Sequence, residues 1–72
     1  MITGDQVTAA RRLIRWSQMT LALEASVLQS TVMKFETGKS EPSALTISNI
    51  KRALEEAGVE FRVGKPVRMR RR

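Results

Sequence analysis

The stretch from Ser17 to Lys39, SQMTLALEASVLQSTVMKFETGK, decides the fold because it has the pattern of two short helices joined by a tight turn. Ser17 is placed to accept a hydrogen bond from a free amide in the first turn of a helix. Leu21, Ala22 and Ala25 follow at offsets that give this helix one buried face. Ala22 is small enough for a second helix to cross closely at that point. We therefore expect a helix-turn-helix unit over about 18–37.

The second helix of this unit has an apolar side and a polar side. Val32 and Phe35 are spaced i, i+3 and should face the interior. In a helix-turn-helix unit the second helix lies in the major groove of DNA, so the polar side is the candidate binding surface. The residues expected to point outward are Gln29, Ser30, Met33, Lys34 and Thr37.

Taken together, these residues resemble the helix-turn-helix of the Cro/C1-type (XRE) transcriptional regulators, the group that contains the lambdoid phage repressors. The resemblance covers roughly residues 5–58 and implies a mainly α, four-helix DNA-binding domain of the lambda-repressor-like class. The matching elements are Ser17-Gln18, Leu21-Ala22, Val27, Ser30-Thr31-Val32, Phe35-Glu36 and Gly38-Lys39, followed by Pro42-Ser43.

The sequence departs from the family pattern at two positions. The family usually has Gly at the turn, where φ is positive, and this chain has Ser26. Serine adopts that conformation at a modest cost. The family also usually has Ser or Thr capping the second helix, and this chain has Leu28. The second helix is therefore expected to begin with a weak cap, or one residue later.

Composition limits the classes of function. A chain of 72 residues makes one small domain, which buries about 60% of its unfolded surface. It has no Cys and no His, so the commonest metal ligands and the commonest general base are absent. No apolar run approaches the roughly 20 residues that span a bilayer, and no signal peptide is recognisable. We expect a cytoplasmic protein that is not an enzyme, with no metal, cofactor or small-molecule ligand.

The net charge of +6 is confined to one end of the chain. Residues 1–61 hold seven basic and seven acidic residues, so their sum is zero. Residues 62–72 hold six basic residues and no acidic one. This distribution favours a polyanionic partner, and the alternative is a basic tail that only aids solubility.

Two further helices are expected around the central unit. Thr3 and Gln6 form a capping box, and the helix after it should run to about Arg15. Ser43 can cap a fourth helix that ends near Ala57, before Gly58. The expected inward stripes are Val7, Ala10, Leu13 and Ile14 in the first of these, and Ile47, Ile50, Ala53, Leu54 and Ala57 in the other.

The apolar period changes from 3.6 to 2 after Gly58. Val59, Phe61 and Val63 alternate with charged residues, and a second alternating run covers 67–70. The pattern predicts two short strands that form a hairpin or pair with a second subunit. The expected organisation is a DNA-binding domain over 1–58 and a basic β extension over 59–72.

Several side chains are candidates for DNA contact. Gln can pair with adenine and Lys can donate to guanine, so the residues expected to contact bases are Gln29, Ser30 and Lys34. The alternative is that they are ordinary solvated helix residues. The expected contacts to the DNA backbone are Gln18, Thr31, Thr37, Lys39, Arg68 and Arg70.

Arg11 and Glu36 are a different kind of pair. The resemblance implies that they bridge the first helix to the end of the third and so have a structural role. The alternative is two independent surface charges.

The resulting hypothesis is a sequence-specific regulator of transcription, most often a repressor, that binds double-stranded DNA as a homodimer on a pseudo-palindromic operator. Small regulators of phages and mobile elements have this appearance. The alternative is a protein-binding module of the same fold, such as an antitoxin or antiactivator, which would use the apolar face of the C-terminal strands. DNA binding should weaken steeply as salt rises, and apolar binding should not.

Overall fold

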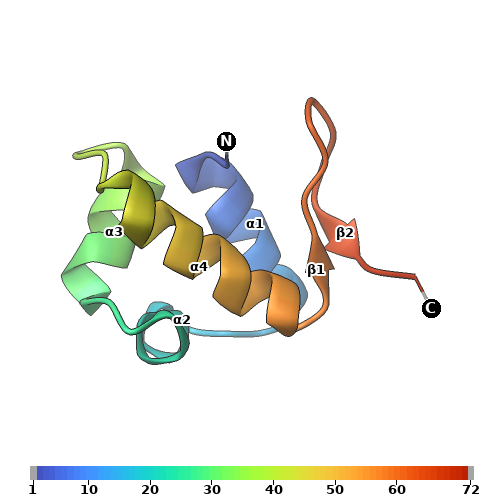
Figure 1. Ribbon diagram of the computed structural model, residues 1–72, viewed down its shortest axis with the longest axis horizontal. Helices are drawn as coiled ribbons and strands as arrows, with labels where there is room; N and C mark the ends of the chain where they lie inside the picture. The colour runs from blue at the N-terminus through green and yellow to red at the C-terminus, as the bar shows by residue number, and fades with distance from the viewer. Residues whose placement is uncertain (1, 72) are drawn as a thin grey trace.

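A computed structural model describes residues 2–71 as four helices and one small antiparallel sheet (Figure 1). The expected mainly α class with a short β extension is confirmed. The elements are α1 (Gly4–Leu13), α2 (Gln18–Ala25), α3 (Gln29–Thr37), α4 (Ala44–Glu56), β1 (Val59–Glu60) and β2 (Arg68–Met69).

Three of the four helices begin at the predicted side-chain caps. Thr3 and Gln6 form a complete capping box, with the Thr3 hydroxyl accepting from the Gln6 amide at 3.2 Å and the Gln6 side chain accepting from the Thr3 amide at 2.9 Å. The Ser17 hydroxyl accepts from the amide three residues further on at 3.0 Å. The Ser43 hydroxyl does the same at 3.2 Å. These bonds satisfy amides that the first helical turn leaves unpaired.

The connection between α2 and α3 contains both departures from the family pattern. Ser26 adopts the left-handed conformation, with φ 58° and ψ 43°, so the chain reverses there without glycine. Leu28 is the residue before α3, and its side chain makes no capping hydrogen bond. Arg15, between α1 and α2, also has a positive φ of 59°, which was not expected because arginine seldom takes this conformation.

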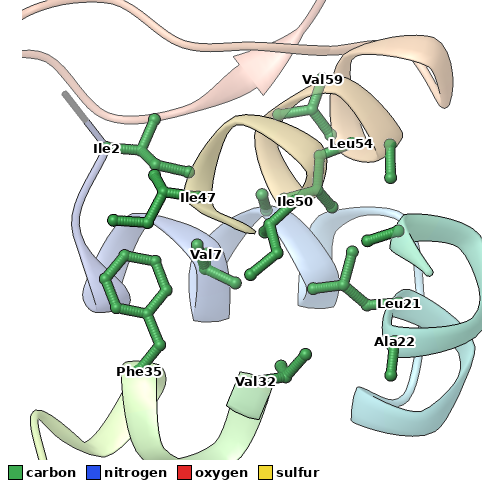
Figure 2. Packing of buried hydrophobic residues seen from close by; sticks show 13 residues of the cluster. Ile2, Val7, Leu21, Ala22, Val32, Phe35, Ile47, Ile50, Leu54 and Val59 are labelled. Carbon is green, nitrogen blue, oxygen red and sulfur yellow. The ribbon is translucent and has the colours of Figure 1, made fainter. Parts of the chain in front are cut away.

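One hydrophobic cluster lies between the helices (Figure 2). Val32 and Phe35 of α3 point toward Val7 of α1 and toward the side chains of α4. Within residues 2–71 the residues of this core are all apolar, and the Glu36 side chain, 5% exposed, is covered beside it by Arg11. The largest side chains that are fully buried are Leu21, Ile50, Leu54, Val7, Val32 and Val59.

Gly4 allows α1 to lie against the end of α3. A Cβ atom at Gly4 would be 2.1 Å from the Phe35 carbonyl oxygen, far inside van der Waals contact. Since that oxygen belongs to the backbone, it could move away only if α3 moved with it. The glycine therefore sets the distance between the two helices.

Three predictions about α1 and α4 were wrong in detail. α1 ends at Leu13 rather than near Arg15, because the chain leaves the helical conformation at Arg15. The Leu13 side chain is 44% exposed and lies outside the core, whereas Ile14 packs against it. Ala57 follows the end of α4 and is only half-buried.

The β extension pairs within the same chain. Val59 lies opposite Met69, and Glu60 lies opposite Arg68. Each strand has only two residues, which is shorter than the alternation predicted. Val59 belongs to the core cluster, and Phe61 and Val67 pack against it. The apolar face of the hairpin therefore rests on the helices.

The alternation predicted that Val63 lies on that apolar face, and this prediction was wrong. Its side chain is 96% exposed, because it lies in the turn at the tip of the hairpin, beyond the paired residues.

Among the described residues, no helix has both the length and the apolar character needed to cross a membrane.

Candidate nucleic-acid interface

α3 presents a row of polar side chains on the surface of the molecule. Gln29, Ser30 and Lys34, the three candidates for base contact, are all exposed. Ser30 and Lys34 lie on the side of the helix opposite Val32 and Phe35, which are buried, whereas Gln29 lies in the first turn, three residues before Val32. A helix of this amphipathic character shows a polar side whose direction is fixed by its packed side. All three base-contact candidates are therefore exposed on α3, and Ser30 and Lys34 share one side of it.

The orientation of α3 is fixed by an ion pair as well as by packing. The Nε and Nη2 atoms of Arg11 donate to the two carboxylate oxygens of Glu36, at 2.8 and 3.0 Å. The side chains are 14% and 5% exposed, respectively. Two parallel hydrogen bonds between planar groups define an angle as well as a distance. Arg11 of α1 thus holds the last turn of α3 in one orientation.

Two other groups join this ion pair. Gln18 donates from its side-chain amide to Glu36 at 3.1 Å, and Arg11 donates to the Trp16 carbonyl at 2.9 Å. The network therefore connects α1, the start of α2 and the end of α3. The sequence predicted that Gln18 contacts a DNA phosphate, but the side-chain amide of Gln18 donates to Glu36 inside the protein. Sequence reasoning missed this contact because residues 18 and 36 are separated by the whole turn.

Burial and hydrogen bonding act on Glu36 in opposite directions. Burial alone would raise the pKa of the carboxyl, but hydrogen bonds from Arg11 and Gln18 outweigh it, so the pKa is lowered. The pKa of Arg11 is raised, chiefly by its hydrogen bond to Glu36. Both residues are thus charged at neutral pH, and the network stays intact there.

Candidate contacts to the DNA backbone lie on both sides of this exposed surface. Thr37 is in the last turn of α3, where its hydroxyl donates to the Met33 carbonyl at 2.9 Å. Lys39 is exposed just after Gly38, which ends the helix in the left-handed conformation with φ 75°. Thr31 is half-buried in the first turn.

Arg68 and Arg70 are not brought to this surface. They lie on the hairpin, at the opposite end of the molecule's long axis from α3 (Figure 1). The Arg68 guanidinium donates to Glu60 across the two strands. The amide of Arg70 donates to the Gly58 carbonyl at 2.7 Å. The candidate residues therefore form two groups rather than one continuous site.

Sequence reasoning also missed two apolar features of the surface. Leu28 is 72% exposed directly before Gln29, at the N-terminal end of α3. A hollow of about 370 Å³ lies between α1 and the hairpin. Its lining is mostly apolar and consists of Asp5, Gln6, Ala9, Leu13, Pro66 and Val67.

Within residues 2–71, no three His, Cys, Asp or Glu side chains are grouped so that they could hold a metal ion. In comparisons with known proteins, no protein-family model matches this chain and no curated protein is significantly similar to it.

Proposed function

We propose that this protein is a sequence-specific DNA-binding regulator of transcription, a repressor of the Cro/C1-type helix-turn-helix class that acts in the cytoplasm as a homodimer. The observation that carries the proposal is that α3 is held in one orientation with a polar side exposed. Its inner side is fixed by buried Val32 and Phe35 and by the Glu36 ion pair, while its outer side presents polar groups. A rigid helix with exposed donors and acceptors is what base recognition in the major groove requires.

The exposed side chains of α3 have the chemistry for base contact. Gln29 can form two hydrogen bonds with adenine, and Lys34 can donate to the O6 and N7 atoms of guanine. Ser30 can donate to or accept from either base. The exposed Leu28 side chain adds an apolar contact for a thymine methyl group. Each good base contact contributes about 1–3 kcal/mol of discrimination.

Residues on both sides of α3 would hold the DNA backbone. Lys39 and Thr37 follow the helix, Thr31 lies in its first turn, and the N-terminus of α2 with Gln18 offers backbone amides to a phosphate. These contacts set the position of α3 in the groove without distinguishing sequences.

The length of α3 favours a dimer. Its nine residues span about 13 Å, or about four base pairs, which is too short a site to be rare in a genome. Two copies related by a twofold axis would place two such helices in successive major grooves, about 34 Å apart. Occupying the operator would then block polymerase.

Footprinting tests the proposal. DNA upstream of the protein's own gene and a pool of random duplexes should be probed at low and at high salt. We expect two protected half-sites about one helical turn apart, with protection that weakens as salt rises. Uniform protection of every duplex, or none even at low salt, would contradict the proposal.

A substitution of Lys34 identifies the surface that contacts the bases. Lys34→Ala should relax preference at one operator position by about tenfold, because a guanine contact is lost. Lys51→Ala is the matched control, since it removes one exposed lysine from α4. If Lys34→Ala leaves every base preference intact, α3 does not lie in the major groove.

The hollow between α1 and the hairpin supports a second candidate function. In this case the chain would be a protein-binding module of the antitoxin or antiactivator type. A partner protein would insert an apolar side chain into the hollow, between Leu13 and Val67. The apolar strand face first expected for this role is covered by the helices, which leaves the hollow as the candidate surface. Binding there should change little with salt, in contrast to DNA binding.

A further inference from the structure

The hairpin has a charged outer face in addition to its apolar inner face. Val59 is buried, so the residue after it, Glu60, faces away from the helices, as does Arg68, which lies opposite it. Arg62 Nε lies 4.0 Å from the Glu60 carboxylate, and Arg70 and Arg71 follow Arg68 directly in the chain. We call this surface the arginine face and define it as Glu60, Arg62, Arg68, Arg70 and Arg71.

A single carboxylate cannot neutralise the arginine face. Arg68 donates to Glu60 directly, while Arg62 Nε lies 4.0 Å from the same carboxylate oxygen and Arg62 Nη2 donates to the Pro66 carbonyl at 3.2 Å. Arg70 and Arg71 are exposed. With four arginines and one glutamate, the face has an excess of three positive charges. An external anion would balance this charge.

The arginine face lies far from the polar side of α3. The molecule measures 32 Å along its longest axis, with α3 near one end and the hairpin near the other (Figure 1). α1 and α4 fill the space between them. A straight duplex docked on the outer side of α3 would therefore be separated from the arginine face by the body of the protein.

We propose that the arginine face binds the sugar-phosphate backbone of a second DNA segment, so that one chain holds two segments, one at each end. Guanidinium groups bind phosphate through paired hydrogen bonds and lose less hydration than ammonium groups do. The contact would be independent of sequence, because only phosphates are bound. This surface can act whether or not α3 distinguishes bases.

The makeup of the arginine face favours nucleic acid over an acidic protein. Val67 packs against the core cluster, and strand alternation puts Met69 on the opposite side of β2 from Arg68. The face therefore lacks the apolar centre with aromatic or aliphatic anchors that protein interfaces usually have. A surface with an excess of arginines and no apolar centre binds phosphates better than it binds a protein.

A bridging assay tests the proposal on the full chain. A biotinylated duplex is fixed to beads and loaded with protein at low salt, and a fluorescent duplex of different sequence is then added. The native protein should retain the fluorescent duplex. Arg70→Ala/Arg71→Ala should retain about tenfold less of it while the amount of protein on the beads stays the same, because two phosphate contacts are lost. Both side chains are exposed.

Two further variants make the test specific. Arg12→Ala/Arg52→Ala removes two exposed arginines from α1 and α4 and should leave retention unchanged. Glu60→Gln removes the acidic group of the face and should raise retention. Circular dichroism checks that each variant keeps the helical content of the native protein.

Three results would overturn the inference. The first is bridging that survives Arg70→Ala/Arg71→Ala, which would mean that two copies of α3 hold the two duplexes. The second is that Arg70→Ala/Arg71→Ala lowers the amount of protein on the beads as much as the amount of fluorescent duplex. This would mean that both ends of the protein bind one bent duplex. The third is competition by polyglutamate but not by duplex DNA. The proposed function fails separately, as a lack of sequence preference in footprinting.

Discussion

Each end of the molecule has an arginine–glutamate pair, and the two pairs differ in burial. Arg11 and Glu36 are 14% and 5% exposed and join α1 to α3, whereas Arg68 and Glu60 are 40% and 34% exposed and join neighbouring strands. Breaking a buried pair leaves a charge without water, but solvent replaces a lost partner at the surface. The buried pair therefore fixes the orientation of α3, whereas the exposed pair contributes mainly its charges to the hairpin surface.

The largest effect on stability should come from breaking the buried pair. Arg11→Met keeps most of the side-chain volume but leaves the Glu36 carboxylate without its main partner. We expect the free energy of unfolding to fall by about 3–5 kcal/mol in a urea titration. Arg12→Met, one residue further along α1 at an exposed position, is the control and should change little. Equal effects of the two substitutions would show that the network does not fix α3.

A smaller effect is expected where α1 meets the end of α3. Gly4→Ala puts a methyl group 2.1 Å from the Phe35 carbonyl oxygen, so the helices must separate. Overpacking of this kind costs about 1–3 kcal/mol, although alanine is otherwise the better helix former. Asp5→Ala, at the next and exposed position of α1, is the control. An increase in stability for Gly4→Ala would show that the two helices can move apart freely.

The dependence of stability on pH should also distinguish the two ends. The pKa of Glu36 is lowered by folding, so its contribution is complete above the unfolded value of about 4.3 and is lost as pH falls through the folded value. Glu36→Gln should therefore flatten the curve of stability against pH below about pH 4.5. Acid titrations followed by circular dichroism measure this.

Glu60 provides the comparison for the acid titration. Its pKa is also lowered, by the hydrogen bond from Arg68, but the group is open to solvent. Glu60→Gln should change the acid part of the curve much less than Glu36→Gln does. If the two substitutions gave the same change, burial would not be what distinguishes the pairs.

Local signals in the sequence predicted the frame of the fold. The caps at Thr3, Ser17 and Ser43 depend on residues three positions apart, so a short window of sequence contains all that they need. The apolar side of α3 follows in the same way from the spacing of Val32 and Phe35.

Features that depend on distant parts of the chain could not be predicted in this way. The contact of Gln18 with Glu36 exists only once α2 and α3 have packed together, and Gly4 has its role only because α3 passes beside it. Alternation suggested that Val63 was inward, yet the pairing of the strands ends before it. The position of Arg68 relative to α3 likewise required the complete fold.

The smallest effect on stability is expected at the hairpin. Arg68→Ala removes the partner of Glu60, but both side chains are more than one-third exposed, so water can take the place of the lost bond. The midpoint of urea unfolding should stay close to that of the native protein. In the bridging assay, the slope of log retention of the second duplex against log salt should become less steep by about one, because one phosphate contact is lost.

The two measurements on Arg68→Ala also test whether the ends are separate in function. Its loss of affinity for the second duplex should be the same for every sequence, whereas the effect of Lys34→Ala on operator binding should depend on the base at one position. If Arg68→Ala changed a base preference, the hairpin would have to influence the orientation of α3. That influence would have to pass through α1, which contacts both β2 and α3 and contains Arg11. Combining Arg68→Ala with Arg11→Met would then give an effect different from the sum of the two, whereas separate ends predict additivity.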